Sequence, residues 1–167
     1  GAEGVIKEFS RGEDAVIGAG TVLSISEAKL ALKAGAAYIV SPNCDEEVIR
    51  FVKKEGAVSI PGACTPTEIY NAYKAGGDII KLFPFVEMGG FNFLKAIRGP
   101  FPFLRYMLCG GANLENFCNY LDAKASAILI GSAVLRRDLV AQEDWLSISG
   151  LARQFVVEME KWREKSA

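Results

Sequence analysis

One lysine occupies a position where its chemistry is unusual. Lys81 lies inside the apolar run Ile79–Phe83, and in a strand it shares a face with Ile79 and Phe83. A lysine buried there must either pair with a carboxylate or give up its proton, and an unprotonated amine is the nucleophile that condenses with a ketone to form an imine. The alternative is a structural lysine, or one that extends to solvent from an edge strand. Position alone does not separate these interpretations.

Two glycine-containing segments indicate an anion site. Gly110 and Gly111 precede a predicted helix, and Gly131 and Ser132 follow the last predicted strand. Loops after the last two strands of a barrel commonly hold phosphate through backbone N–H groups and a helix N-terminus. Either loop alone is a weak signal, because glycines also serve simply to relieve tight turns.

Two other segments combine small residues with a threonine hydroxyl. In Gly18–Val22, Thr21 offers a hydroxyl to a carboxylate, although a structural turn explains the segment equally well. In Ile60–Thr65, Thr65 is best interpreted as a helix cap.

The overall composition excludes several classes of function. The 167 residues include no histidine, which removes histidine-dependent triads and histidine-ligated zinc. The four cysteines form no C-x-x-C pair and predict reduced thiols in a cytoplasmic protein, with Cys109 and Cys118 interpreted as structural. A net charge of −1 without a basic stripe argues against nucleic acid. No apolar run approaches the roughly 18 residues of a membrane span, so no membrane partner is expected.

Short apolar runs recur along the chain at intervals typical of a βα unit, and each is a predicted parallel strand. They are 15–17, 38–40, 58–60, 79–83, 104–108 and 127–130. Helices are predicted between them at 27–34 with Ser26 as N-cap and Gly35 after its end, at 45–54, at 66–75 and at 114–121 after Asn113. A last helix carries an apolar stripe from Ile148 to Trp162.

Strict βα alternation leaves a doubly wound sheet or a (β/α)8 barrel as the architecture. No G-x-G-x-x-G motif is present, which argues against a dinucleotide-binding sheet. Polar, glycine or proline residues follow every predicted strand, as at barrel active sites. The sequence therefore predicts one α/β domain over residues 1–167, of the (β/α)8 TIM-barrel type and two βα units short of a full barrel.

Several motifs, in order and spacing, resemble the 2-keto-3-deoxy-6-phosphogluconate / 4-hydroxy-2-oxoglutarate aldolases, which are class I aldolases. The similarity extends from about residue 14 to the C-terminus and includes Gly18–Leu23, Ser41-Pro42, Ile60–Gly62, Thr65–Glu68, Lys81–Pro84, Gly99–Phe101 and Gly110-Gly111. The resemblance implies trimeric (β/α)8 barrels that need neither metal nor cofactor. It implies that Lys81 forms a Schiff base with the keto group of a small 2-keto acid.

The resemblance also assigns the other site residues. Thr21 is expected to contact the pyruvyl carboxylate, and Pro42, Gly62 and Phe83 to line the substrate site. Gly110, Gly111, Gly131 and Ser132 are expected to bind a phosphate.

Three features depart from the family pattern. The family's first two βα units, which carry a proton-transfer glutamate and a carboxylate-binding arginine, have no counterpart upstream of Ala15; residues 1–9 resemble only the end of the second helix. Leu108-Cys109 stands where Pro-Thr is common, which removes a substrate-facing hydroxyl. Val86 occupies the usual position of a glutamate, and Glu87 follows it.

The sequence thus predicts a lyase that splits a 2-keto-3-deoxy-6-phospho sugar acid or 4-hydroxy-2-oxoglutarate into pyruvate and an aldehyde. Two alternatives stay open: a degenerate barrel that binds a phosphorylated ligand without catalysis, and a fragment of an ordinary enzyme. Because six strands cannot close an eight-stranded barrel, an aggregation-prone product or a partner-covered edge is expected.

Overall fold

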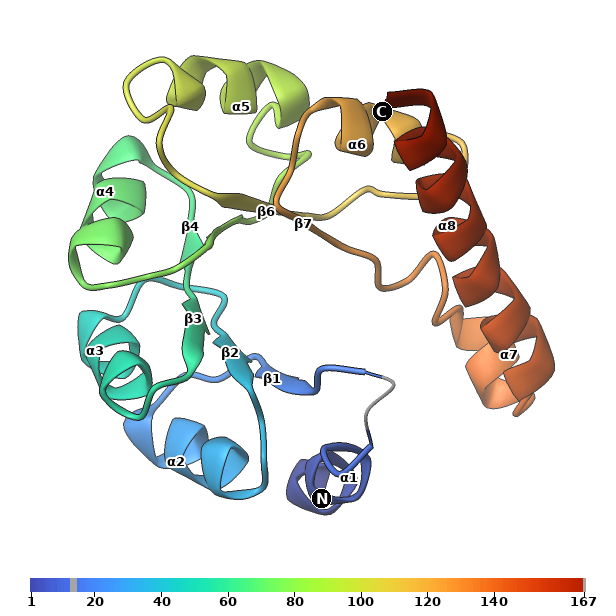
Figure 1. Cartoon of the computed structure of the whole chain (residues 1–167), viewed down its shortest axis with the longest axis horizontal. Coiled ribbons are helices and arrows are strands. Elements are labelled where there is room, and N and C mark those ends of the chain that lie inside the picture. Colours follow the sequence, from blue (N-terminus) through green and yellow to red (C-terminus); the bar gives the residue numbers. More distant parts are fainter. Residues whose placement is uncertain (13–14, 167) are drawn as a thin grey trace.

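The computed structural model describes residues 1–12 and 15–166 and has alternating strands and helices (Figure 1). The strands are β1 (Gly18–Gly20), β2 (Tyr38–Val40), β3 (Val58–Ile60), β4 (Gly62–Ala63), β5 (Ile80–Leu82), β6 (Tyr106–Cys109) and β7 (Ala127–Leu129). The helices are α1 (Ala2–Phe9), α2 (Ile25–Lys33), α3 (Glu46–Lys54), α4 (Pro66–Lys74), α5 (Gly90–Arg98), α6 (Phe117–Asp122), α7 (Arg137–Ala141) and α8 (Trp145–Ser166). None of the helices in the described part of the chain is both long enough and apolar enough to cross a membrane.

All strand pairs are parallel and follow chain order. One sheet has the order β1-β2-β3 and the other β4-β5-β6-β7. β3 and β4 are one stretch of chain interrupted at Pro61, whose carbonyl oxygen accepts the Lys81 N–H at 2.8 Å. Hydrogen bonds from the Ser41 N–H to Ile60 and from the Gly62 N–H to Asn43 continue across the interruption, so the strands form one curved wall. The helices lie outside this curved wall of strands, as in a TIM barrel (Figure 1).

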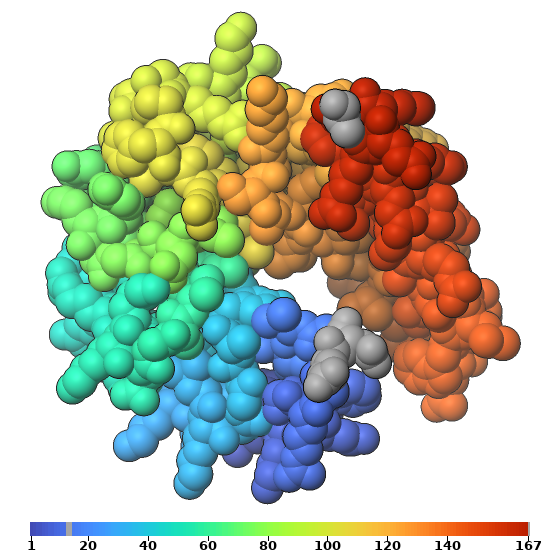
Figure 2. Space-filling view, viewed as in Figure 1, coloured from blue at the N-terminus to red at the C-terminus, as the bar shows by residue number. Residues whose placement is uncertain are grey.

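The ring of strands is open in the described structure. β1 and β7 each pair on one side only, and the space-filling view shows an opening between the N-terminal segment and the C-terminal helices (Figure 2). The α/β fold of the TIM-barrel type, two units short of closure, is therefore confirmed.

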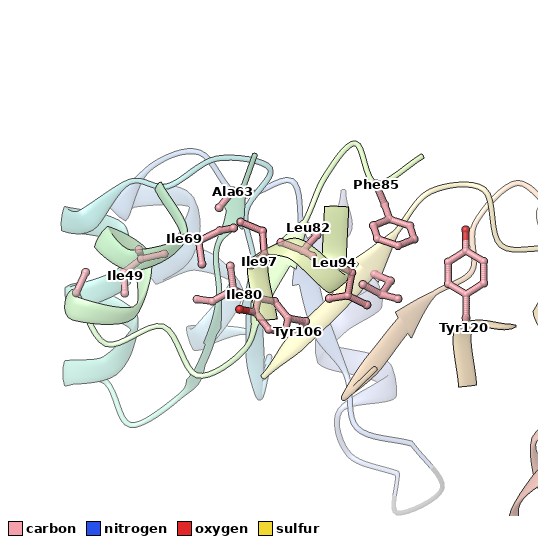
Figure 3. Packing of buried hydrophobic residues seen from close by; sticks show 13 residues of the cluster. Ile49, Ala63, Ile69, Ile80, Leu82, Phe85, Leu94, Ile97, Tyr106 and Tyr120 are labelled. Atoms are coloured by element: carbon pink, nitrogen blue, oxygen red, sulfur yellow. The ribbon is translucent and has the colours of Figure 1, made fainter. Parts of the chain in front are cut away.

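Alternation along the strands separates an inner from an outer layer. Outward-facing side chains of β5 and β6 pack against the helices in the main apolar cluster, which Figure 3 shows and which includes Ile80, Leu82, Tyr106, Leu108, Ile69, Leu94 and Ile97. Inward-facing residues form a smaller cluster around Val40, Ile60 and Met107. Any site at the strand ends therefore packs against this inner cluster.

Several helix ends follow the local signals in the sequence. Asp45 and Thr65 cap α3 and α4 by accepting backbone N–H groups, and Pro66 starts α4 as predicted. Gly35 and Gly76 take φ values of 107° and 105° just after α2 and α4, the conformation in which glycine favours helix termination.

Other boundaries differ from the predictions. The first strand lies at 18–20 rather than 15–17, because pairing with β2 begins only where the Ile17 carbonyl accepts the Ala37 N–H. Ser24 caps α2 in place of Ser26. Asn113 forms reciprocal hydrogen bonds with Asn116 in a turn, so α6 starts three residues later than predicted, at Phe117.

Candidate active site

Lys81 lies at the centre of β5 and is 8% exposed. Its register partners are Gly62 on β4 and Met107 on β6. Because Met107 belongs to the inner cluster, Lys81 also faces the inside of the ring. In residues 1–12 and 15–166 no carboxylate forms an ion pair with Lys81. A buried amine without a carboxylate partner is the arrangement that suits a nucleophile.

Two side chains lie close to the Lys81 amine. The ring of Phe83, on the same face of the chain, has its centroid 4.6 Å from Nζ, which is a cation–π distance. The Cys109 thiol is buried at the end of β6, on the same inner face as Lys81, and lies diagonally across from it, because Lys81 pairs with Met107 two residues earlier. Burial raises the pKa of this thiol above its ordinary value, and the Lys81 charge opposes that rise.

The family resemblance places Cys109 where a substrate-facing hydroxyl is common, but sequence reasoning missed its position beside Lys81. Cys109 was interpreted there as structural because no histidine or second cysteine lies near it in the chain. The available signal was periodicity: Cys109 is two residues beyond Met107, so both point to the same face of β6. The register of β5 and β6 then places that face beside Lys81.

Pro42 and Gly62 meet next to Lys81. A Cβ built on Gly62 would lie 2.2 Å from the Pro42 carbonyl oxygen, a distance that no side chain tolerates. The two loops are also joined by the Gly62 N–H, which the Asn43 carbonyl accepts at 3.2 Å. Thus the structure brings Pro42, Gly62 and Phe83 together around Lys81.

Thr21 follows β1 at the same edge of the ring, on the far side of β2 and β3 from Lys81. Its φ of 59° is in the left-handed region, where a β-branched residue is strained. Such strain persists only where surrounding structure imposes it and is found often at binding sites. The Val22 N–H, which the Val40 carbonyl accepts at 3.2 Å, fixes the chain directly after Thr21.

The two glycine loops follow neighbouring strands, because β6 and β7 pair in parallel up to Cys109 and Leu129. Gly110 and Gly111 have φ values of 123° and 75°. Their carbonyls are held by the Tyr120 hydroxyl, which donates to Gly110 at 2.7 Å, and by the Asn116 amide, which donates to Gly111 at 2.8 Å.

These hydrogen bonds turn the loop carbonyls toward α6. Tyr120 itself is buried against the rings of Phe85 and Phe91, with centroids 5.7 and 5.0 Å away. Across the gap between the loops, the Gly131 carbonyl accepts N–H groups from Val134 and Leu135 in a turn, and Ser132 is exposed. The arrangement leaves the exposed Ser132 hydroxyl and glycine backbone near the ends of two adjacent strands.

Metal-binding groups are not gathered at this site. Among the described residues, no cluster of three or more histidine, cysteine, aspartate or glutamate side chains has the spacing to hold a metal ion.

Fold and site together define a TIM-barrel-type protein with an inward-facing, buried lysine at the centre of one strand and a glycine-containing loop after each of the next two strands. A model of the KDPG and KHG aldolase family matches residues 1–151. The chain belongs to this family.

Similar proteins support the assignment. The chain is 38% identical over 138 residues to the 2-dehydro-3-deoxy-phosphogluconate aldolase of Pseudomonas aeruginosa, covering 83% of this chain and 63% of that protein. It is 32% identical to the KHG/KDPG aldolase of Escherichia coli K12, over 86% of this chain and 67% of that protein. It thus spans about two thirds of the length of these relatives.

Solved structures agree. A native KDPGal structure superposes with a TM-score of 0.85 at 28% identity, over 97% of this chain and 76% of that one. The KDPG aldolase of Legionella pneumophila, with pyruvate captured as a covalent carbinolamine, gives a TM-score of 0.81 at 28% identity. The match covers 90% of this chain and 73% of that one.

Proposed function

We propose that this chain performs the Schiff-base chemistry of a class I aldolase on a small 2-keto acid, with Lys81 as the nucleophile. The observation that carries the proposal is the buried, inward-facing Lys81 with no carboxylate partner among the described residues. The capture of pyruvate as a carbinolamine in the Legionella aldolase supports the same chemistry here. The substrate is a 2-keto-3-deoxy-6-phospho sugar acid or 4-hydroxy-2-oxoglutarate, and the products are pyruvate and an aldehyde.

In this proposal the Lys81 amine adds to the C2 carbonyl, and loss of water gives the iminium ion. The iminium nitrogen draws the C3–C4 bonding electrons toward itself, so that the bond breaks, the C4 hydroxyl loses its proton and an aldehyde leaves. Protonation of the enamine at C3 and hydrolysis release pyruvate and restore Lys81.

The remaining site residues position the substrate. The Thr21 hydroxyl binds the carboxylate, while Pro42, Gly62 and Phe83 form the wall around C2 and C3. A terminal phosphate, where the substrate has one, is held by the backbone of Gly110, Gly111 and Gly131 and by the Ser132 hydroxyl. The parallel pairing of β6 with β7, which puts both loops at the same end of neighbouring strands, supports this last assignment.

Assembly as a homotrimer is part of the proposal. Four aromatic side chains gather on the surface at α4 and the segment before β6: Tyr70 stacks on Phe101 at 5.7 Å, and Tyr73 contacts Phe103 at 5.3 Å. Tyr70, Tyr73 and Phe103 are each more than 40% exposed, and exposed aromatic groups of this kind favour protein contacts. Light scattering should give the mass of a trimer for the wild type and a smaller mass for Phe103→Asp. A monomeric wild type would contradict the proposed trimer.

The chemistry is tested by borohydride reduction in the presence of pyruvate, followed by intact mass and peptide mapping. We expect a reduced pyruvate adduct on Lys81, none in Lys81→Met, and an unchanged adduct in Lys95→Ala, which removes an exposed lysine of α5. A folded protein without the adduct contradicts the proposal.

The openness of the ring favours a second function, a non-catalytic barrel that binds a phosphorylated ligand. β1 and β7 present unpaired edges in the described structure, and loss of general acid–base catalysis lowers a rate by about 10²–10⁴-fold without removing the backbone groups of Gly110 and Gly111 that would bind a phosphate. Binding of inorganic phosphate by a folded protein that forms no pyruvate adduct is the outcome that selects this function.

A further inference from the structure

The Cys109 thiol is a buried, titratable group that the steps above leave unused. It is 6% exposed, lies at the carboxyl end of β6 and points to the same inner face as Met107. Its main-chain carbonyl accepts the Phe85 N–H at 3.1 Å, which fixes the end of β6 against the loop that follows Lys81. The thiol therefore has a defined position beside the reacting nitrogen.

We propose that Cys109 is a catalytic residue of the imine chemistry: its thiol gives a proton to the hydroxyl that leaves the carbinolamine on Lys81, and its thiolate recovers a proton from the water that later hydrolyses the imine. This inference rests on the proposed function, since it assigns a role within the Schiff-base cycle of Lys81.

The step balances without another reactant. The amine adds to C2 and its surplus proton passes to the former carbonyl oxygen, which gives a neutral carbinolamine. The C–O bond then breaks, the oxygen takes the Cys109 proton and leaves as water, and the nitrogen lone pair forms the C=N bond. An iminium cation and a thiolate remain as an ion pair. In hydrolysis the reverse transfer restores the thiol, so the complete cycle leaves Cys109 unchanged.

The surroundings of Cys109 suit this exchange. Burial raises the pKa of the thiol, so the proton is present when the carbinolamine forms. The Lys81 charge is the opposing influence that lowers the pKa, and the iminium nitrogen places its charge at the same position just as the proton departs. Among the described residues Lys81 is the charged group that acts on this thiol. The positive charge at this nitrogen thus continues to favour the thiolate while the iminium ion exists.

The inference is tested by the rate of imine formation with pyruvate, measured by rapid mixing, borohydride quenching and mass spectrometry across a pH series. Cys109→Ala should form the Lys81 adduct about 10²-fold more slowly or worse, the usual loss when general acid catalysis is removed. The wild-type rate should fall at alkaline pH as the thiol ionises. Cys109→Ser keeps a side chain of similar volume but lacks an acid of suitable strength. This variant should therefore form the adduct slowly, and its rate should not show the fall at alkaline pH.

Cys118→Ala is the matched control, because Cys118 is an exposed thiol, and it should keep the wild-type rate and profile. Thermal unfolding establishes that each variant is folded, and the Ser variant serves if the Ala variant is not. A Cys109→Ser rate within about threefold of wild type, with the alkaline limb retained, overturns the role of Cys109 and leaves the Schiff-base assignment standing. Absence of any Lys81 adduct in the wild type overturns both.

Discussion

The carbonyl oxygen of Pro42 occupies the space that a side chain on Gly62 would need, 2.2 Å from an ideal Cβ. The loop after β2 therefore crosses directly over β4, next to Lys81 on β5. This packing requires glycine for reasons of space rather than backbone conformation, since Gly62 has no positive φ.

Substitution of Gly62→Ala should therefore displace the Pro42 loop. We expect a loss of about 1–3 kcal/mol in the free energy of unfolding, as for overpacked cores, and at least a tenfold slower pyruvate adduct on Lys81. Urea unfolding and borohydride trapping measure the two effects. Gly150→Ala is the control, because a Cβ there meets nothing within 4 Å and alanine favours the helix interior; equal effects of the two variants would disprove the steric explanation.

Thr21 should show a conflict between stability and binding. Thr21→Gly relieves the strain of a φ of 59° and, after the entropy that glycine adds to the unfolded chain, should raise the free energy of unfolding by about 1 kcal/mol. The same change removes the hydroxyl proposed to bind the carboxylate, so half-maximal trapping should need several-fold more pyruvate. Thermal melts and a pyruvate titration measure the two effects, and a variant that is both more stable and unchanged in titration removes Thr21 from the site.

Tyr120→Phe should loosen the Gly110-Gly111 loop. Loss of the 2.7 Å hydrogen bond to the Gly110 carbonyl should cost about 0.5–1.5 kcal/mol of stability and weaken binding of inorganic phosphate several-fold by calorimetry. Tyr106→Phe is the matched control: its hydroxyl donates to the Phe101 carbonyl at 3.2 Å, outside the loop. Similar loss of phosphate binding in both variants would show that the loop geometry is not responsible.

Glu68 should make stability depend on pH. The hydrogen bond from the Cys64 N–H, opposed by desolvation and aided by hydrogen bonds from Thr65, holds the pKa of this carboxyl below its usual range. Because the folded pKa is the lower one, the contribution is complete above the pKa of the unfolded chain and is lost as pH falls through the folded value. The difference in free energy of unfolding between the wild type and Glu68→Gln should therefore decrease from about 1 kcal/mol at neutral pH toward zero in acid. Urea unfolding at both pH values checks this, and a pH-independent difference contradicts it.

Local patterns predicted the repeating elements well. Short apolar runs located the strands β2, β3, β5, β6 and β7, and the helices predicted at 45–54 and, after the cap Thr65, at 66–75 correspond to α3 and α4. The position of Lys81 in an apolar strand was also readable, because one charged residue breaks an otherwise buried pattern. These features depend on residues within a few positions of one another.

Features that depend on register were not readable in the same way. β1 consists of Gly18, Ala19 and Gly20, which have little strand preference, and it exists because β2 pairs with it. α5 begins at two glycines without a capping side chain, so no start signal marks it. The contacts of Cys109 with Lys81 and of Pro42 with Gly62 join different strands, and only the folded register brings them together.

The interruption at Pro61 does not divide the site, because residues 58–63 keep backbone hydrogen bonds to both neighbours: Ser41 donates to Ile60 and Gly62 to Asn43 on one side, and Lys81 donates to Pro61 on the other. Thr21 follows β1, which is not a neighbour of the strand that carries Lys81. A keto acid held at its carboxylate by Thr21 and at its C2 by Lys81 therefore reaches across the inside of the ring, and its length limits how far apart these two strands can lie while it is bound.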